Sequence, residues 1–290
     1  MRYAAPTTVD EARSLLAAHP GSRVFAGATD LIPQIRAGRP APPVLVDLKR
    51  IDQLMTVVQE DGQWRIGAAT PTSNLTRNRD FTAMFPGLSE AMGLIGSDQI
   101  QNRSSLGGNL ANASPAADSV PAMIANAVQA VIASGDGTRT VPVAEIATGP
   151  GQTSLADGEF IVEFTVADPP SNTSDAYLRM IPRTEMDIAI VGAAVRLTVD
   201  GDIVTDATVV LGAVAPTAVT VPEAGAALVG AAIDAGSIDG SAMDTLADAA
   251  SAACDPIDDK RGTVAYRRQV AGVMARRAAA IAVGRAQNGV

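Results

Sequence analysis

The sequence has 290 residues, of which 47% are hydrophobic, and a formal net charge of −9. An acidic balance opposes sequence-independent binding of nucleic acid, because a basic surface is needed to neutralise phosphates. No apolar run reaches the roughly 20 residues that a membrane span needs. The opening residues lead into a polar amphipathic segment, which is not the pattern of a signal peptide. We therefore expect a cytoplasmic protein, and a length prior of roughly 150 residues per domain favours two domains.

The side chains that hold metals are almost missing. Cys254 is the only cysteine and His19 the only histidine. One cysteine excludes an internal disulfide and an iron–sulfur cluster held by this chain alone, since such clusters need about four thiolates. A histidine-based zinc site is equally disfavoured. The chemistry must come from an organic cofactor, from carboxylates and hydroxyls, or from a partner chain.

Short helices and strands alternate in the first part of the chain. Thr8 and Glu11 have the spacing of a capping box, which predicts a helix that ends at His19. Asp61 and Gly62 are typical of a tight hairpin turn. The pattern predicts strands at 23–26, 44–48, 57–58 and 64–68, a helix at about 30–37, and mostly helix over 80–95.

The rest of the chain begins with a long polar stretch, residues 96–118, that lacks clean periodicity and is therefore expected to be functional. Residues 168–174 form the best linker candidate. The arginine pairs 267–268 and 276–277 are interpreted as a solvated helix face. The remaining predictions are strands at 128–133, 138–143, 160–166, 188–199 and 203–213, and helices at 222–229, 240–252 and 261–284. Together they predict an N-terminal α+β domain followed by a smaller C-terminal sheet covered by helices.

Two glycine-bearing loops carry the candidate chemistry. Residues 25–31 leave a strand and enter a helix, so that Gly27 would let the backbone come close to an anion at the helix N-terminus. Most turns in which a glycine joins a strand to a helix bind no ligand, so a purely structural turn is the alternative interpretation. In the second loop, residues 102–118, Gly107 and Gly108 are bracketed by hydroxyl and amide side chains and would form a nest of donors suited to a pyrophosphate. The alternative interpretation of this second loop is a polar surface loop that binds no ligand. Neither loop has a Rossmann or P-loop pattern.

These loops resemble those of the FAD-binding medium subunit of molybdenum hydroxylases, the family that includes xanthine and carbon monoxide dehydrogenases. The family pattern A-G-G-T-D-L appears at 26–31 as A-G-A-T-D-L, and the pattern I-R-N-R-G-T-I-G-G-N appears at 100–109 as I-Q-N-R-S-S-L-G-G-N. The element A-S-P-x-x-D follows at 113–118, and 182–189 is similar to the element R-R-x-x-D-x-A. The resemblance extends over essentially the whole chain.

The resemblance implies an α+β fold: a bilobal FAD-binding domain of the vanillyl-alcohol-oxidase (PCMH) type, then a smaller C-terminal domain of a sheet with helices. It places the first domain at 1–170, with lobes at about 1–55 and 56–170, and the second at 176–290. It implies that FAD is held by both loops and by isolated residues near the adenine, ribityl and isoalloxazine groups. The implied FAD-binding residues are Ala26, Gly27, Ala28, Thr29, Asp30, Leu31, Ile95, Ser105, Gly107, Gly108, Asn109, Ala111, Asn112, Asp118 and Ile161. No catalytic residue and no metal ligand is expected.

The sequence departs from the family pattern at several positions. Ala28 stands where the family usually has glycine, which is tolerable only if φ there is negative. Gln101 and Thr184 each replace an arginine, and Met180 replaces a lysine found in purine-oxidising members, which disfavours NAD as the acceptor. The first loop also lacks the A-G-G-H-S form associated with carbon monoxide dehydrogenases.

By this resemblance, the protein is an oxidoreductase subunit that passes electrons from the [2Fe–2S] clusters of a partner chain through FAD to an external acceptor. The implied partners are a large molybdopterin-binding subunit and a small [2Fe–2S] subunit, assembled as a dimer of heterotrimers. One alternative is a stand-alone FAD-dependent reductase of the same superfamily, such as one acting on a UDP-sugar. A non-catalytic alternative is a protein that binds the nucleotide without redox turnover.

Overall fold

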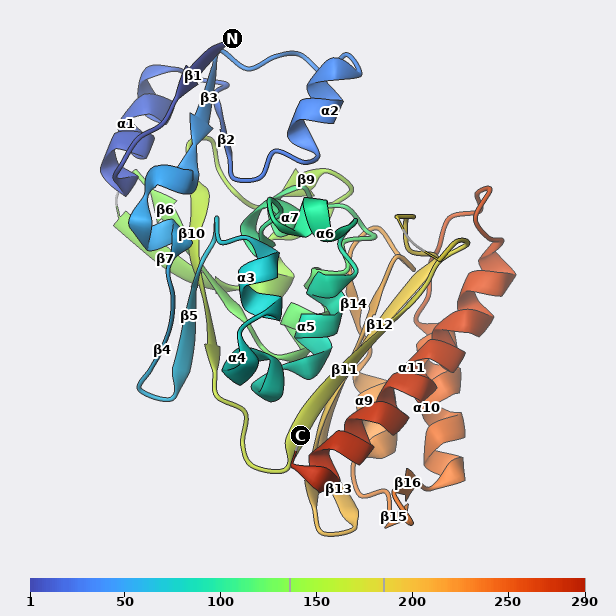
Figure 1. The fold of residues 1–290 in the computed structure, drawn as a ribbon. Helices are drawn as coiled ribbons and strands as arrows, with labels where there is room; N and C mark the ends of the chain where they lie inside the picture. The colour runs from blue at the N-terminus through green and yellow to red at the C-terminus, as the bar shows by residue number, and fades with distance from the viewer. Residues whose placement is uncertain (136, 185, 290) are drawn as a thin grey trace. The chain divides into compact units, whose positions relative to one another are not determined.

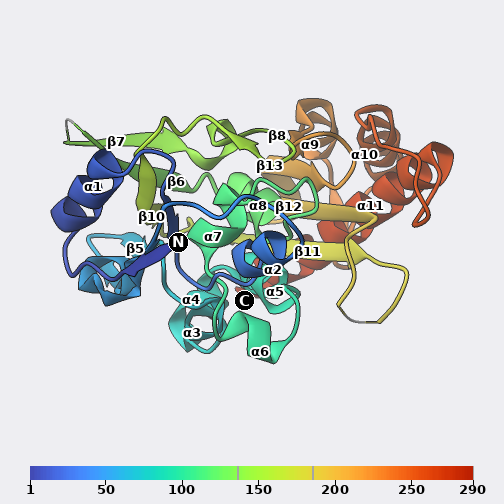
Figure 2. The same cartoon turned by 90° about the horizontal axis from the view of Figure 1, so that it is seen from above.

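The structure is a computed structural model that describes residues 1–135, 137–184 and 186–289, drawn in Figures 1 and 2. The chain packs into two units. The first unit consists of residues 1–74, 98–113 and 128–168, and the second of residues 75–97, 114–127 and 169–290.

A small parallel sheet opens the first unit. Its strand order is β1 (Arg2–Ala4), β3 (Val44–Asp47), β2 (Arg23–Phe25). The central strand β3 is buried along its length, as expected for a strand covered on both faces. The connections carry α1 (Val9–Ala18) and α2 (Leu31–Arg36), and after β3 come the short helices η1 (Leu48–Arg50) and η2 (Asp52–Met55).

The predicted capping box of α1 is confirmed in part. The Glu11 backbone amide donates to the Thr8 hydroxyl at 3.1 Å. The Glu11 carboxylate accepts from the backbone amide of Thr7 at 2.7 Å, one residue earlier than the standard box requires. The helix ends before His19, as predicted.

A five-stranded antiparallel sheet completes the first unit. Its order is β4 (Val57–Glu60), β5 (Gln63–Gly67), β10 (Phe160–Ala167), β6 (Gln129–Ser134), β7 (Gly137–Pro142). The predicted Asp61–Gly62 hairpin is confirmed between β4 and β5, and the strands predicted at 128–133 and 138–143 pair as β6 and β7. Asp136, between these two strands in sequence, lies outside the described residues. The smaller elements here are α6 (Asp98–Gln101), α7 (Leu106–Ala111), η3 (Val143–Glu145), β8 (Ala147–Gly149) and β9 (Gln152–Thr153).

The second unit is built on a four-stranded antiparallel sheet ordered β11 (Thr173–Met180), β12 (Val191–Asp200), β13 (Ile203–Gly212), β14 (Val219–Thr220). Its helices are α4 (Arg79–Met84), α5 (Pro86–Gly93), α8 (Ser119–Ala125), α9 (Pro222–Leu228), α10 (Gly240–Ala252) and α11 (Val264–Asn288). A two-stranded ribbon, β15 (Ile233–Asp234) and β16 (Ser237–Ile238), precedes α10. Helix α3 (Thr72–Thr76) straddles the division between the units.

The sheet of the second unit is buried on both faces. On one face, Val195 and Leu211 join the core under α9, α10 and α11, and Figure 1 shows α11 running along β11 and β12. On the other face, Gly212 leaves room for α8: a Cβ atom at Gly212 would lie 2.7 Å from Pro121. Two-sided burial explains why the first half of β12, residues 191–195, is an unbroken apolar run, while polar and apolar residues alternate in its second half.

Three sequence predictions need correction. Strand β11 begins at Thr173, inside the predicted linker, and was missed because it contains the buried polar residues Ser174 and Asp175. Strand β1 was also missed. The stretch 96–118 is not irregular throughout, since it contains α6 and α7. The predicted strands at 188–199 and 203–213 and the three C-terminal helices are present, with boundaries shifted by up to four residues.

Asp175 anchors two helices of the second unit to β11. Its carboxylate accepts hydrogen bonds from the backbone amides of Gly87 (2.8 Å) and Leu88 (2.9 Å), in the first turn of α5. It also accepts from the Asn126 side chain at 2.7 Å, at the end of α8. Helix N-terminal amides have no partner within their own helix, so this distant carboxylate serves as their cap.

We predict that Asp175→Ala lowers the free energy of unfolding by about 3 to 5 kcal/mol, because it leaves buried donors without an acceptor. Urea unfolding followed by circular dichroism measures the change. The matched control is Asp206→Ala in β13, whose ion pair with Arg196 is exposed on the Asp206 side and should contribute less than about 1 kcal/mol. Equal effects of the two substitutions would contradict the anchoring role.

Candidate functional site

The two glycine-bearing loops meet in the first unit. A Cβ atom at Gly27 would lie 2.0 Å from the carbonyl oxygen of Arg103 and 3.0 Å from the backbone nitrogen of Ser104. Such distances leave no space for a side chain, so glycine is required at position 27 by the contact between the two backbones. Residues that are more than 70 positions apart in sequence are therefore brought together where the sequence predicted a shared ligand.

The first loop carries a strained residue. Ala28 has a φ of 58°, in the left-handed region, where the sequence-based expectation was a negative φ; that expectation is wrong. The conformation is kept because the Ala28 carbonyl accepts the first hydrogen bond of α2, from Ile32 at 3.1 Å. Among the described residues, the backbone amides of Ala28 and Thr29 have no hydrogen-bond partner. Ala26 is buried, Gly27 and Leu31 are half-buried, and Asp30 is exposed.

Lys49 holds the first loop from η1, just after β3, a contact that sequence analysis missed. Its ammonium donates to the carbonyl of Ala26 at 2.8 Å and to Asp47 at 2.5 Å, and it lies 4.6 Å from the ring centroid of Phe25. Burial alone would raise the pKa of Asp47, but the hydrogen bonds from Lys49 and from the Tyr3 hydroxyl hold it below its usual value. The Asp47 carboxylate therefore stays ionised at neutral pH.

The second loop contains α7, and the N-terminus of this helix is fixed from two sides. The Ser105 hydroxyl accepts from the Gly108 amide at 3.1 Å, as an N-cap. The Gly107 amide donates to Ala68 at 3.2 Å, and Ser105 forms a β-bridge with Pro71. The segment after β5 thus runs alongside the loop.

The three glycines of the two loops have different surroundings. A Cβ atom at Gly107 would lie 2.5 Å from the carbonyl oxygen of Ala68, so Gly107, like Gly27, is required by backbone contact. Gly108 is exposed, and a Cβ atom there would meet only the Ser105 hydroxyl, at 3.3 Å. Gly108 is the position where the loop is open to a ligand.

A side-chain hydrogen bond also joins the helices that follow the loops. The Gln34 amide in α2 donates to Asn112, at the C-terminus of α7, at 3.1 Å. Asn109 is half-buried and Ala111 is exposed on α7. Ile161 lies in β10, is 5% exposed and precedes a register shift of that strand.

Two predicted FAD-binding residues belong to the second unit. Ile95 is half-buried just after α5. Asp118 is buried, and its carboxylate accepts from the Tyr177 hydroxyl at 2.9 Å and from Arg179 at 2.8 Å. Burial raises the pKa of Asp118 to about 6, although Arg179 and Tyr177 act in the opposite direction.

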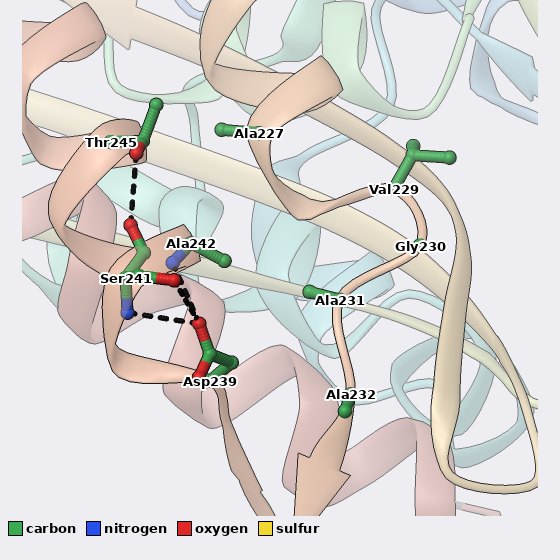
Figure 3. A pocket seen from close by; sticks show the side chains of 9 residues that line it. All are labelled: Ala227, Val229, Gly230, Ala231, Ala232, Asp239, Ser241, Ala242 and Thr245. Carbon is green, nitrogen blue, oxygen red and sulfur yellow. Dashed lines mark hydrogen bonds between the residues drawn. The ribbon is translucent and has the colours of Figure 1, made fainter.

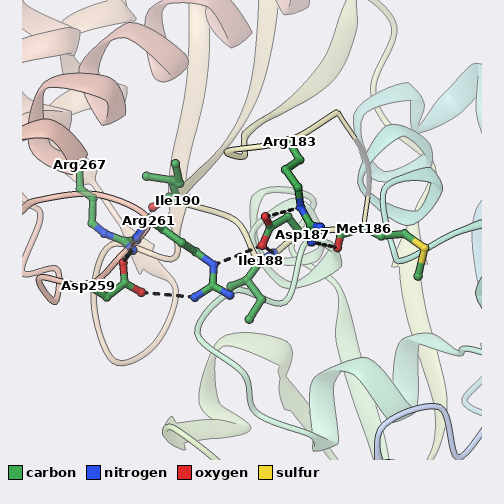
Figure 4. Close-up of polar contacts among 8 residues, drawn as sticks. All are labelled: Arg183, Met186, Asp187, Ile188, Ile190, Asp259, Arg261 and Arg267. Carbon is green, nitrogen blue, oxygen red and sulfur yellow. Dashed lines mark hydrogen bonds and ion pairs between the residues drawn. The ribbon is translucent and has the colours of Figure 1, made fainter.

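The third sequence patch, 182–189, is held by ion pairs within the second unit (Figure 4). Asp187 accepts from its neighbour Ile188 at 2.8 Å, from Arg183 at 3.0 Å and from Arg261 at 3.3 Å, and these hydrogen bonds lower the pKa of its carboxyl. Glu185, in the middle of the patch, lies outside the described residues.

The predicted solvated arginine face of the last helix needs one correction. Arg267 is only 3% exposed. Its guanidinium donates to the carbonyl of Ile190 at 2.7 Å and pairs with Asp259 at 2.8 Å, as Figure 4 shows. Arg268, Arg276 and Arg277 are exposed, as expected.

The second unit also has a pocket of about 430 Å³ beside the N-terminus of α10 (Figure 3). None of the residues predicted to bind FAD lines it. The Asp239 carboxylate on its wall accepts hydrogen bonds from the backbone of Ser241 and Ala242, so it acts as the helix cap. Within the described parts of the chain, no cluster of side chains is suited to a metal ion, and no helix is long and apolar enough to cross a membrane.

The residues of the two loops fit the pyrophosphate of FAD. Main-chain amides at helix N-termini and in turns are the usual ligands of phosphates. Here two helix N-termini are joined by a backbone contact at Gly27, with the partnerless amide of Thr29 on one side and the exposed Gly108 on the other. The geometry therefore supports the ligand that the sequence indicated.

We predict that Ala28→Gly stabilises the protein. A non-glycine residue in the left-handed region costs about 1 to 2 kcal/mol, and the greater freedom of glycine in the unfolded chain returns about 0.4 to 1 kcal/mol. The net gain should be roughly 0.5 to 1 kcal/mol, measured by urea unfolding. The control is Ala280→Gly, at an exposed position inside α11, which should lose about 1 kcal/mol. A loss at both positions would show that Ala28 is unstrained.

Comparison with known proteins shows the family of the chain. Residues 1–169 match the family described as "FAD binding domain in molybdopterin dehydrogenase", and residues 176–282 match "CO dehydrogenase flavoprotein C-terminal domain". The chain is 33% identical over 277 residues to the carbon monoxide dehydrogenase medium chain of Hydrogenophaga pseudoflava, covering 95% of this chain and 94% of that one. It is 34% identical to the medium chain of the same name from Afipia carboxidovorans, covering 99% and 98%.

A solved structure shows the same fold. The carbon monoxide dehydrogenase of Hydrogenophaga pseudoflava, in a form lacking the Mo-pyranopterin moiety of its cofactor, includes a chain that superposes with a TM-score of 0.93 at 34% identity, covering 98% of both chains. The α+β fold expected from the sequence is confirmed. The chain belongs to the FAD-binding medium-subunit family of the molybdenum hydroxylases, which are oxidoreductases.

Proposed function

We propose that this chain binds FAD in the cradle formed by its two glycine-bearing loops and transfers electrons through it within a larger complex. The observation that supports this most is the backbone contact between Gly27 and Arg103. It joins the two predicted phosphate-binding turns while Gly108 stays open. FAD, once bound, supplies the redox chemistry, and the protein supplies binding, orientation and electrostatic tuning.

Each part of the cradle has its own task in this proposal. The backbone amides of Ala28 and Thr29 would hold the pyrophosphate, and the exposed Gly108, whose own amide donates to Ser105, would leave room for it. Lys49 keeps the first loop in place through the Ala26 carbonyl. Asn109, Asn112 and Asp118 would bind the ribityl and phosphate region. Ile95 would lie near the adenine and Ile161 near the isoalloxazine, and Ala111 is the remaining predicted contact.

The electrons would come from a partner chain. One cysteine, Cys254, cannot hold an iron–sulfur cluster. Burial raises the pKa of the Cys254 thiol to about 11, which disfavours the thiolate that binds metals. A small [2Fe–2S] subunit would therefore deliver electrons, a large molybdopterin-binding subunit would oxidise the substrate, and an external acceptor would take electrons from FAD. A cytoplasmic dimer of heterotrimers and the domain division near residue 170 are part of the proposal.

The family comparisons support this function over the stand-alone reductase that the sequence left as an alternative. The medium chains match this chain over nearly its full length and theirs. A subunit of that kind binds no substrate of its own, so the identity of the substrate belongs to the large subunit.

We predict that Gly108→Val removes FAD without unfolding the protein. A Cβ atom at this position meets no backbone, so the fold should tolerate it, but the valine methyl groups would occupy the place of a phosphate oxygen. The ratio of flavin absorbance to protein absorbance should fall at least about tenfold, which from near saturation requires a rise in Kd of more than about tenfold, or more than about 1.4 kcal/mol. The urea midpoint should change little.

The matched control is Gly93→Val at the exposed end of α5, where a Cβ atom meets nothing within 4 Å. That variant should retain full flavin content. If Gly108→Val keeps its FAD, or if the wild-type protein takes up none, the cradle is not the FAD site.

We also predict that gentle lysis of the native host yields the chain in a complex with two further proteins, one large and one small and rich in cysteine. Affinity capture followed by mass spectrometry and metal analysis for molybdenum and iron measures this. Capture of the chain alone, with FAD bound, would instead favour a stand-alone reductase.

A further inference from the structure

Arg179 joins three segments of the second unit. Its side chain lies at the end of β11 and is 6% exposed. Its Nη1 donates to the carbonyl of Leu94, at the C-terminus of α5, at 2.8 Å, and to the Asp118 carboxylate, at the N-terminus of α8, also at 2.8 Å. The surroundings are specific, because Gly192 leaves room for Tyr177, whose hydroxyl holds the other oxygen of Asp118.

The two groups that Arg179 binds are next to the residues of this unit that are expected to contact FAD. Asp118 is itself one of them. The Leu94 carbonyl belongs to the peptide bond that leads into Ile95, which is the other. A single buried guanidinium therefore fixes the carboxylate and the backbone beside the apolar contact.

We propose that Arg179 is a positioning residue for FAD, acting through Asp118 and the Leu94–Ile95 peptide bond. This rests on the proposed FAD-binding function and extends it to a residue outside both loops. Arg179 touches protein groups only, and a fixed donor that makes two charge-assisted or polar hydrogen bonds keeps both segments in one geometry before the ligand arrives.

The charge of Arg179 also sets the ionisation of Asp118. The charged and titratable groups that face Asp118 are Arg179 and Tyr177, both from β11. With Arg179 present, the pKa of Asp118 is about 6, so at neutral pH the carboxylate is ionised and accepts hydrogen bonds. The pKa of Tyr177 is raised well above its usual range by burial and by Asp118, so it remains a donor. Loss of the Arg179 charge would raise the pKa of Asp118 further, so that its carboxylate would ionise only at a higher pH.

The test compares Arg179→Met, Arg179→Lys and the control Arg196→Met, whose arginine forms an exposed pair with Asp206 in the same sheet. Apoprotein is titrated with FAD across pH 5 to 9, and urea unfolding is measured for each variant. We expect Arg179→Met to bind FAD at least about tenfold more weakly at neutral pH. We also expect the FAD affinity of Arg179→Met to rise with pH over a higher pH range than that of the wild type, because Asp118 would ionise at a higher pH. Arg179→Lys should restore most of the affinity, and Arg196→Met should match the wild type.

Because a lone buried carboxylate destabilises the fold, the double variant Asp118→Asn/Arg179→Met provides a second measurement. It removes both charges and should fold, bind FAD weakly and lose the pH dependence. Wild-type affinity with a wild-type pH profile in Arg179→Met or in the double variant would overturn the positioning role, even if stability fell. Absence of FAD binding by the wild-type protein would instead overturn the proposed function itself.

Discussion

Gly27 lies so close to the carbonyl group of Arg103 that a methyl group cannot fit between them, and this contact brings the two candidate phosphate loops together. The first loop follows the parallel strand β2, and the second precedes α7, so their meeting depends on where the strands of the first unit place them. A larger residue at 27 would separate the two helix N-termini that face one anion in the proposed function. Lys49 acts on the same contact from η1, since it binds the Ala26 carbonyl one residue before the glycine.

The glycines of the site divide into two kinds, and the division separates structure from ligand binding. Gly27 and Gly107 are packed against backbone atoms, so substitution there disturbs the fold first. Gly108 is open, so a side chain there reaches the ligand first. Ala28 shows that a positive φ alone does not require glycine: the conformation is retained at some cost in free energy because it starts α2. Conformation, packing and the proposed ligand contact are thus three separate reasons for small residues in these two loops.

Much of the fold could be predicted from local patterns. The Thr8 cap, the Asp61–Gly62 hairpin and the apolar strand β12 depend on neighbouring residues, and the structure has all three. What depends on distant partners could not be predicted. Strand β11 has no apolar alternation, because Asp175 and Arg179 are buried by pairing with other segments. Lys49, the inward-facing Arg267 and the φ of Ala28 likewise follow from contacts that no spacing in the sequence indicates.

Buried charge has a consistent role in the second unit. Aromatic residues make up only 3% of the chain, and the core there consists mainly of alanine, valine and leucine, which pack well but do not fix the path of a loop. Asp175, Arg179 and Arg267 each bind backbone groups at the ends of other elements. Hydrogen bonds of this kind are directional, whereas apolar packing is not. In the proposed function the chain must hold its cofactor in one position, and polar residues that fix helix ends are one way in which its own side chains can do so.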